Sequence, residues 1–274
     1  MSTDTGRAAE TAPKVVAEGV RKTFTTRRRG EVVAIESIDL AVQPGEFVSI
    51  VGPSGCGKST FLYIVGGFEK ASGGVITCDG DPITGPGANR GIVFQEFALF
   101  PWKNVLSNVT YGLARQGVPR AERLERAREL LQTVNLGGIE KLYPKELSGG
   151  MKQRVAIART LAMDPDVLLM DEPFGALDAQ TRAVLQIELM EIWQRNRKTV
   201  LFVTHSVEEA LYLSDRVIVF SDRPSRVKAV IDVPIPRPRD RERLLAHPLY
   251  PELHAKIWRL LQNEDVDEDA LSGR

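Results

Sequence analysis

The sequence predicts an α/β fold around a parallel sheet, with a helical insertion at about residues 96–160. Three largely apolar segments, GEFVSIVG (45–52), DVLLMDE (166–172) and KTVLFVTH (198–205), are typical of strands buried on both faces of a sheet. Helical segments separate these strands along the chain, and this alternation indicates a parallel sheet. With 274 residues, of which 43% are hydrophobic, the chain is long enough to bury a substantial core.

Two strands are expected before the first buried strand. KVVAEGVRKTF (14–24) and VVAIESIDLAV (32–42) are rich in β-branched residues, and we assign them to an antiparallel β subdomain. TTRRRGE (25–31) lies between them, and its three arginines are expected to face water in a hairpin turn. Residues 1–13 are small and polar, which predicts a disordered tail. The main domain is therefore placed at residues 14–232, and a C-terminal connector and helix at residues 233–274.

The helical insertion is predicted from RAERLERARELLQTVNL (120–136). Leu124, Ala127, Leu131 and Val134 recur at spacings of three and four, so they form one core-facing stripe. A second helix is expected to begin after Ser148, a favoured N-cap, and to run to residue 162.

The second half of the chain continues the alternation of strands and helices. Ser206 and Glu209 predict a capping box at the start of the helix SVEEALYLS (206–214). The Pro- and Arg-rich segment 234–248 is interpreted as an exposed connector. The other expected elements are the helices DAQTRAVLQIELMEIWQRN (178–196) and PELHAKIWRLLQNE (251–264) and the strands DRVIVFS (215–221) and RVKAVIDVPI (226–235).

Charge and cysteine content restrict the classes of function. The chain has 36 Lys and Arg against 36 Asp and Glu, so it lacks the net positive field of a nucleic-acid-binding protein, and no nucleic-acid partner is expected. No apolar run approaches the roughly 20 residues that span a bilayer, and the N-terminus lacks the apolar core of a secretory signal. Cys56 lies in a glycine-rich loop and Cys78 in an expected strand, which favours a reducing compartment over a disulfide. His247 and His254 lack the spacing of metal ligands.

The segment GPSGCGKS (52–59) fits G-x-x-x-x-G-K-[ST], the pattern of a phosphate-binding loop between a strand and a helix. Its glycines let backbone N–H groups converge on phosphate oxygens, and the helix N-terminus adds positive charge. Lys58 is expected to reach the β- and γ-phosphates of ATP, and the Ser59 hydroxyl to bind Mg²⁺. The residues predicted to bind ATP in this segment are Gly52, Pro53, Ser54, Gly55, Cys56, Gly57, Lys58, Ser59 and Thr60.

Two acidic side chains and one imidazole follow buried strands at their carboxyl ends, where ligands bind in open α/β sheets. Asp171 is placed to hold Mg²⁺ through water. Glu172 is placed to polarise an attacking water as a general base. His205 follows a neighbouring strand, and its position favours a contact with the γ-phosphate.

Several motifs together resemble those of the ATPase subunits of ABC transporters, which are P-loop NTPases. In chain order they are the phosphate-binding loop, Gln95 after RGIVF, LSGGM (147–151), LLMDEP (168–173), ALD (176–178) and His205. The resemblance covers about residues 15–230 and implies ATP and Mg²⁺ as ligands. Two positions depart from the family pattern. Met151 stands where many members have Gln, and Ser206 stands where an acidic residue is common, but neither change removes a γ-phosphate donor.

The resemblance also implies a head-to-tail dimer, in which each LSGG turn completes the ATP site held by the partner's phosphate-binding loop. Ser148, Gly149 and Gly150 lie at a predicted helix N-terminus, which suits the γ-phosphate of a partner's ATP. A capped helix start would account for Ser148 as local structure but leaves the two adjacent glycines unexplained. Asp178 is similar to the family's dimer-contact aspartate, so these four residues are expected to act on ATP in trans.

Two further roles come from the resemblance. Gln95 matches the residue that contacts Mg²⁺ and the attacking water and that couples the ATP site to the permease. Phe24 occupies the place of the aromatic residue that stacks on adenine, with a position in the core of the first strands as the alternative.

The segment EFALFPWKNVLSNV (96–109) indicates the importer branch of the family. Together with the motifs above, it is similar to the ATPase subunits of nitrate, sulfonate and taurine importers. Trp102 in this segment suits a contact with a groove on the permease, with local packing as the alternative. The resemblance implies a homodimer, peripheral at the cytoplasmic face of the membrane. Its implied partners are a transmembrane permease and an extracytoplasmic substrate-binding protein.

Four other functions fit parts of the pattern. A soluble ABC ATPase of DNA repair or translation would usually show a long coiled-coil insertion or two fused ATPase domains, and this chain has neither. A small-molecule kinase would need an acceptor site and has no use for LSGG. Lys58, Asp171 and Glu172 disfavour a non-catalytic scaffold. An importer for another small solute is the alternative for the cargo, since other subunits bind cargo in this family.

Overall fold

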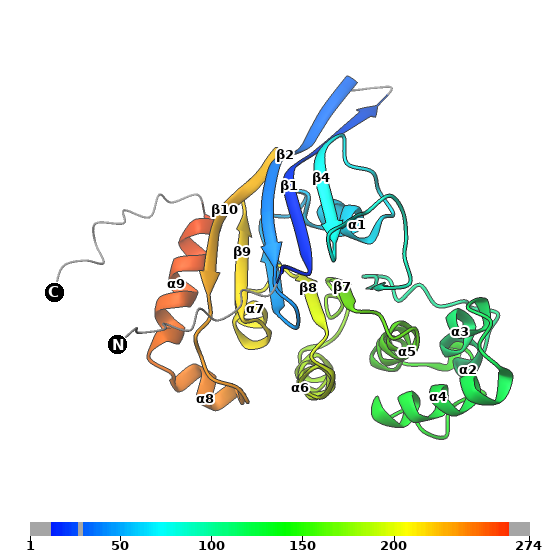
Figure 1. Cartoon of the computed structure of the whole chain (residues 1–274). Coiled ribbons are helices and arrows are strands. Elements are labelled where there is room, and N and C mark those ends of the chain that lie inside the picture. The colour runs from blue at the N-terminus through cyan, green and yellow to red at the C-terminus, as the bar shows by residue number, and fades with distance from the viewer. Residues whose placement is uncertain (1–11, 27–29, 263–274) are drawn as a thin grey trace, which may run out of the picture.

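The computed structural model describes residues 12–26 and 30–262, and the strands in these ranges form one curled sheet (Figure 1). Most of the predicted N-terminal tail, the three arginines at 27–29 and the C-terminal residues 263–274 lie outside the described residues. The strands are β1 Val15–Thr26, β2 Gly30–Val42, β3 Phe47–Val51, β4 Gly73–Cys78, β5 Asp81–Pro82, β6 Arg90–Val93, β7 Val167–Asp171, β8 Thr199–Val203, β9 Arg216–Phe220 and β10 Ser225–Asp232.

The sheet has a parallel half and an antiparallel half. Within the described ranges its strand order is β5-β4-β1-β2-β10-β9-β3-β8-β7-β6. Strands β6, β7, β8, β3 and β9 are parallel to one another, which confirms the predicted parallel sheet. Every residue of β3, β7 and β8 is buried, as expected for strands covered on both faces. β10 joins the halves, because it pairs with β9 antiparallel and with β2 parallel.

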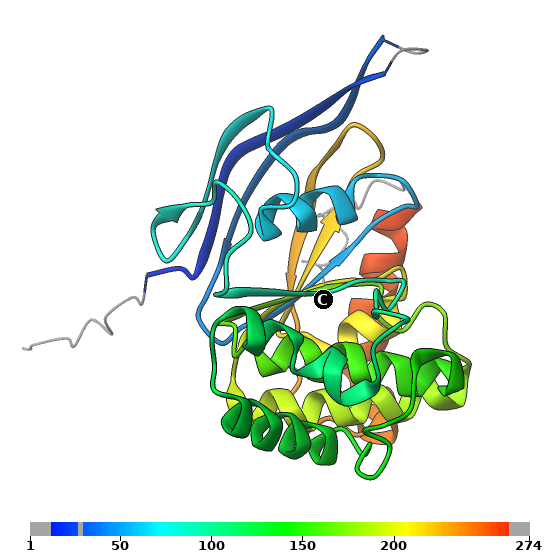
Figure 2. The ribbon, with the colours of Figure 1, turned by 90° about the vertical axis from the view of Figure 1, so that its right-hand side faces the viewer.

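Helices pack on both faces of this sheet. The helices are α1 Lys58–Gly66, α2 Val105–Val109, α3 Tyr111–Arg115, α4 Arg120–Thr133, α5 Gly149–Ala162, α6 Ala179–Asn196, α7 Val207–Leu213, α8 Arg241–Ala246 and α9 Leu249–Leu261. The sheet curls around α1, so that Phe61 and Leu62 share one core with Ile35 of β2 and Ile50 of β3 (Figure 2). On the opposite face, α6, α7 and α9 share a second core with the parallel strands. No helix in the described ranges is long and apolar enough to span a membrane.

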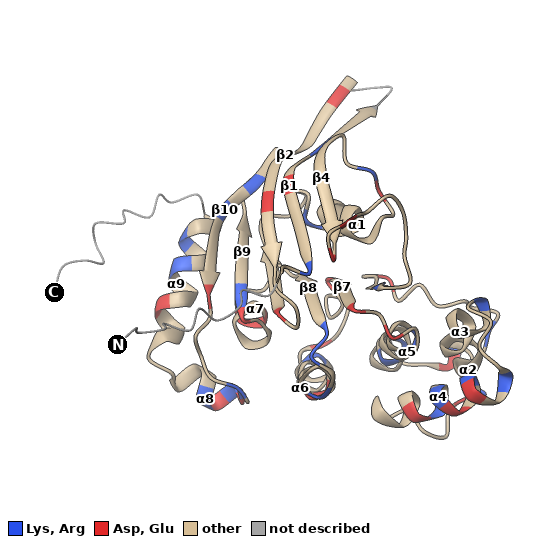
Figure 3. Ribbon diagram, in the orientation of Figure 1, with Lys and Arg blue, Asp and Glu red and all other residues tan. Residues whose placement is uncertain are grey.

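The helical insertion has a third core of its own, formed by α2, α4 and α5. Ala127, Leu131 and Val134 are buried in it and Leu124 is half-buried, which confirms the predicted stripe. Basic and acidic side chains are interspersed along the rest of α4 (Figure 3). The Ser148 hydroxyl accepts a hydrogen bond from the Met151 N–H at 3.3 Å, so the predicted N-cap of α5 is confirmed.

The predicted capping box at the start of α7 is only half correct. The Ser206 hydroxyl accepts from the Glu209 N–H at 3.2 Å. The Glu209 side chain, however, does not return to the Ser206 backbone. It is buried against α6, where its carboxylate accepts hydrogen bonds from Gln186 and from the Thr204 hydroxyl. The Ser206 N–H donates to Thr204 instead, and this bond replaces the second half of the box.

The prediction that residues 234–248 form an exposed connector is only partly correct: most of these residues are exposed, but Ile235, Arg239 and Leu244 are buried and α8 lies within the segment. Arg239 is only 9% exposed, and burial lowers its pKa to about 10. Its guanidinium group satisfies carbonyl groups at the end of α7, which have no partner within the helix. Arg237 pairs with Asp215 at 2.9 Å and lies over the Trp193 ring at 4.5 Å. The carbonyls that accept from Arg239 belong to Leu211, Tyr212, Ser214, Val233 and Ile235.

Candidate active site

The phosphate-binding loop connects β3 to α1 and opens onto a cavity of about 430 Å³. The cavity collects residues from segments that are far apart in the sequence, because the parallel strands end at the same edge of the sheet. Its lining residues are Phe24, Ala34, Ser54, Gly55, Gly57, Lys58, Ser59, Thr60, Gln95, Glu172 and Arg223. Phe24 thus faces the same cavity as the loop. Its stacking on adenine stays a prediction.

The loop has the backbone that a phosphate cradle requires. Gly57 has a φ of 118°, and a Cβ atom there would lie 3.1 Å from the Ser225 hydroxyl, so a side chain at Gly57 would crowd the loop. The Lys58 ammonium group donates to the carbonyls of Gly52 and Pro53 at 2.8 and 2.9 Å. The Cys56 side chain is buried, and burial raises the pKa of its thiol. Cys56 can therefore contribute its backbone, but not a thiolate, to a bound nucleotide.

Ser59 and Asp171 come together at the start of α1 and the end of β7. The Ser59 hydroxyl donates to Asp171 Oδ1 at 2.8 Å. Burial raises the pKa of the Asp171 carboxyl, and hydrogen bonds from Ser59 and Tyr63 oppose that rise. A hydroxyl and a carboxylate are hard oxygen ligands, so this pair fits Mg²⁺. The described residues contain no cluster of three or more His, Cys, Asp or Glu that could hold a metal ion.

Tyr63 is a site residue that the sequence analysis missed. Its hydroxyl donates to Asp171 Oδ2 at 2.8 Å, so the carboxylate is held by one hydrogen bond on each oxygen. Burial and this bond raise the pKa of the Tyr63 phenol, which stays a donor. Tyr63 follows Ser59 by four residues, which places both side chains on one face of α1. This four-residue spacing is the feature of the sequence that could have identified Tyr63.

Glu172 lies between the other two residues predicted to act on water. The Glu172 carboxylate is 3.2 Å from His205 Nδ1 and accepts from Gln95 Nε2 at 3.5 Å, in both cases through Oε2. Its backbone φ of 42° lies in the left-handed region, which is unfavourable for a residue other than glycine. The Glu172 N–H donates to the Val203 carbonyl of β8, and the Gly175 N–H donates to the Glu172 carbonyl. These bonds hold the turn that directs the carboxylate toward the cavity.

Ser148, Gly149 and Gly150 do not line the cavity of their own chain. The structure also supplies a local reason for Gly150, which the sequence analysis had not found. A Cβ atom at Gly150 would lie 2.6 Å from the Thr181 methyl group of α6, so the two helices can approach this closely only with glycine at that position. Asp178 likewise has a local role, because its carboxylate caps α6 by accepting from the Thr181 N–H at 2.9 Å. Hydrogen bonds from Thr181 lower the Asp178 pKa.

Trp102 does not line the ATP cavity and lies beside a separate groove. Its side chain is 72% exposed, and its ring packs against Phe100 with a centroid separation of 5.8 Å. Phe100 and Tyr111 line the groove, which has a volume of about 350 Å³ and also contains Phe94 and Met163. The groove lies between the end of β6 and the helical insertion. Trp102 is thus largely free of local packing.

Comparison with known proteins gives concordant matches. A family model described as ABC transporter matches residues 35–175. A Methanocaldococcus jannaschii protein, described as an uncharacterized ABC transporter ATP-binding protein, is 50% identical over 251 residues, covering 92% of each chain. The nitrate import ATP-binding protein NrtD of Synechocystis sp. is 45% identical over 246 residues, covering 88% of this chain and 92% of NrtD. A solved dimeric ATP-binding cassette in a post-hydrolysis state with ADP and Pi aligns with a TM-score of 0.71. It is 33% identical, over 80% of this chain and 98% of the cassette.

Proposed function

Because the chain belongs to the ABC transporter family of ATPases, we propose that it is the ATP-hydrolysing subunit of an importer for a small anion. The observation that carries the hydrolytic part is the convergence of Glu172, His205 and Gln95 beside the phosphate-binding loop. The importer part is supported by the similarity to nitrate import ATP-binding proteins at about 45% identity over most of both chains.

The proposed chemistry divides the work among the residues of the cavity. The loop N–H groups and the Lys58 ammonium group bind the β- and γ-phosphates of ATP. Ser59 and Asp171 hold Mg²⁺, which when bound neutralises charge on these phosphates. Glu172 accepts a proton from the attacking water, while Gln95 and His205 orient that water and the γ-phosphate.

We further propose that two copies of the chain work as a head-to-tail dimer. The ATP cavity is formed without Ser148, Gly149 or Gly150, so the α5 N-terminus is left for the nucleotide of a partner. A solved cassette of similar fold is a dimer. The two local roles found for Gly150 and Asp178, packing and capping, are compatible with this arrangement, because each fixes the α5 or α6 N-terminus in place.

The groove beside Trp102 is the proposed docking site for a transmembrane permease. Its aromatic lining and the exposed indole ring are typical of anchors at protein interfaces. Docking there would place the subunit at the cytoplasmic face of the membrane as a peripheral protein. A substrate-binding protein outside the membrane would complete the importer.

For the cargo we propose nitrate first and then an aliphatic sulfonate or taurine, since nitrate import is what the named relative performs. The test is uptake of labelled nitrate, taurine and an alkanesulfonate by cells that lack the gene, complemented with the intact chain or with Glu172→Gln. Loss of uptake of one anion, restored by the intact chain alone, is the expected outcome. Normal uptake of all three anions in the deletion strain would reject this cargo class.

A further inference from the structure

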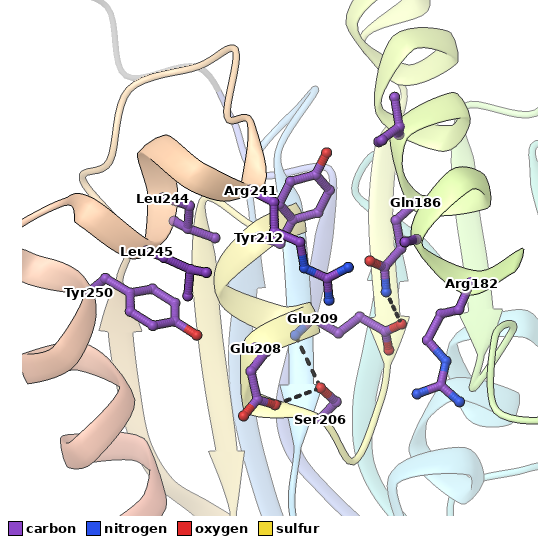
Figure 4. Close-up of a pocket in the computed structure, with 12 residues that line it drawn as sticks. Arg182, Gln186, Ser206, Glu208, Glu209, Tyr212, Arg241, Leu244, Leu245 and Tyr250 are labelled. Atoms are coloured by element: carbon purple, nitrogen blue, oxygen red, sulfur yellow. Dashed lines mark hydrogen bonds between the residues drawn. The ribbon is translucent and has the colours of Figure 1, made fainter. Parts of the chain in front are cut away.

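A second pocket, distant from the phosphate-binding loop in sequence, opens between α6, α7, α8 and α9 (Figure 4). Its volume is about 420 Å³, within the range of sites that hold small organic molecules. α6 begins after Asp178, and α7 begins two residues after His205. The pocket therefore lies where α6 and α7, the helices that follow Asp178 and His205, meet the C-terminal helices α8 and α9.

The walls of this pocket are mainly apolar and partly open to solvent. Ile187 of α6 and Leu245 of α8 are 50% and 56% exposed, which is high for large aliphatic side chains. Leu244 and the ring of Tyr212 are buried behind them. Such walls can cover the apolar body of a ligand.

The two carboxylates at the pocket already have partners inside the protein. Glu208 shares one carboxylate oxygen with His254 at 3.0 Å and the other with the Ser206 hydroxyl at 2.9 Å. Both oxygens of Glu209 accept hydrogen bonds, from Gln186 and Thr204. The acidic side chains thus have little remaining capacity for a ligand.

Two donors at the pocket do not have such partners. The guanidinium group of Arg241 and the hydroxyl of Tyr250 make no hydrogen bond or ion pair with any residue that the structure describes. Figure 4 shows both groups directed toward the middle of the pocket, from α8 and α9. Burial raises the pKa of the Tyr250 phenol, and the charge of Glu208 adds to this rise while the charge of Arg241 opposes it. The pocket consequently has two free donors, two satisfied carboxylates and apolar walls, and this combination favours an oxyanion attached to an apolar group.

We propose that this pocket binds a small organic acid, with its carboxylate on Arg241 and Tyr250 and its apolar body between α6 and α8. The negative charge of Glu208 lies against α9, where its carboxylate is 3.0 Å from His254, so the carboxylate of the acid binds on the Arg241 side of the pocket. A bound acid would therefore bridge α8 and α9 to α6. The site is separate from the nucleotide cavity and does not depend on the cargo proposed above.

The test is a calorimetric titration of the full chain with 4-phenylbutyrate, compared with the neutral 4-phenylbutanamide. We expect saturable binding of the acid at about millimolar concentration and at least about tenfold weaker binding of the amide. Arg241→Gln should weaken binding of the acid by at least about tenfold. Arg243→Gln is the matched control, because Arg243 lies on the same helix, is 81% exposed and pairs with Asp240 rather than lining the pocket.

Leu245→Trp provides a second test that keeps Arg241. The larger side chain should fill the space between α6 and α8 and abolish binding without changing the melting temperature, since Leu245 is on the surface. Three results would overturn the proposal. These are no saturable binding of the acid to the unmodified chain, equal binding of acid and amide, and equal loss of binding in Arg241→Gln and Arg243→Gln.

Discussion

Glu172 combines an unfavourable backbone conformation with a carboxylate shared by His205 and Gln95. Backbone strain of this kind persists where the surrounding structure holds a functional side chain in place. Glu172→Gln keeps the size and polarity of the side chain but cannot accept a proton. We expect ATP hydrolysis to fall by about 10²-fold or more, while ATP binding persists. Phosphate release and equilibrium binding of a fluorescent ATP analogue measure the two quantities.

Glu242→Gln is a suitable control for this change, since Glu242 is an exposed residue of α8. Its hydrolysis rate should equal that of the unmodified chain. Normal hydrolysis by Glu172→Gln would show that another group takes the proton.

In the proposed site, Tyr63 contacts Asp171 and would act on Mg²⁺ only through that carboxylate, so we treat it as a positioning residue. Removal of its hydroxyl leaves Asp171 Oδ2 without its hydrogen bond and free to turn. For Tyr63→Phe we expect the Mg²⁺ concentration at half-maximal hydrolysis to rise by about three- to tenfold, with the rate at saturating Mg²⁺ within about twofold. Tyr111→Phe, which removes a hydroxyl from the helical insertion, should leave the Mg²⁺ dependence unchanged. Equal Mg²⁺ dependence in the two variants would contradict the positioning role.

At the scale of elements, the C-terminal segment is part of the main core and not an appendage. Leu244, Ile257 and Leu260 share a hydrophobic cluster with the parallel strands. Arg239 binds this segment to the end of α7 through the carbonyls of Leu211, Tyr212 and Ser214, and it also donates to two carbonyls of its own segment. The attachment explains why the helix after His205 has a fixed end as well as a capped start.

Arg239→Met should therefore destabilise the whole domain. The substitution leaves buried carbonyls without a donor, and we expect the free energy of unfolding to fall by about 2–4 kcal/mol. Urea denaturation measures this change. Arg243→Met, at an exposed position on α8, should cost less than about 0.5 kcal/mol. Equal stability of the two variants would mean that water replaces the guanidinium group at these carbonyls.

The sequence predicted elements better than it predicted their contacts. Apolar runs identify β3, β7 and β8, because a strand buried on both faces needs an apolar side chain at nearly every position. The place of β10 between β9 and β2 could not be predicted, because alternation within a strand does not specify its neighbours. Arg237 and Arg239 were assigned to solvent because charged residues in Pro-rich segments usually face water. Only the fold brings the end of α7 to them.

In the candidate site, too, the sequence predicted the residues of the motifs better than it predicted the contacts between them. Lys58, Asp171 and Glu172 stand in motifs whose spacing is fixed by local backbone geometry, so sequence alone identifies them. Gly150 belongs to such a motif as well, but its packing against Thr181 depends on how α5 crosses α6. The contact of Tyr63 with Asp171 joins residues 108 positions apart. The sequence could show only that Tyr63 shares a helix face with Ser59, and not that this face meets Asp171.

At the scale of the whole molecule, Ser148 does not line the cavity beside the phosphate-binding loop of its own chain. The proposed head-to-tail arrangement predicts that Ser148 instead supplies a donor to the nucleotide of a partner. Ser148→Arg should block hydrolysis by obstructing the partner's nucleotide, and Ser148→Asp should block it by repelling the γ-phosphate. Aspartate is also a favoured N-cap, so the second variant keeps the cap of α5 and serves as the control for folding.

Mixing two inactive variants separates this arrangement from a purely local role of Ser148. In a mixed dimer of Ser148→Asp and Lys58→Ala, the intact loop of the first chain faces the intact Ser148 of the second. Random pairing makes about half of the dimers mixed, each with one working site of two, so about a quarter of the normal rate should return if the sites act independently. If Ser148 only caps α5 in its own chain, the Asp variant alone stays active. If the dimer is not head to tail, the mixture stays as inactive as its components. Failure of the two chains to associate would give the same inactivity, and measuring the hydrolysis rate at increasing protein concentration separates the two explanations.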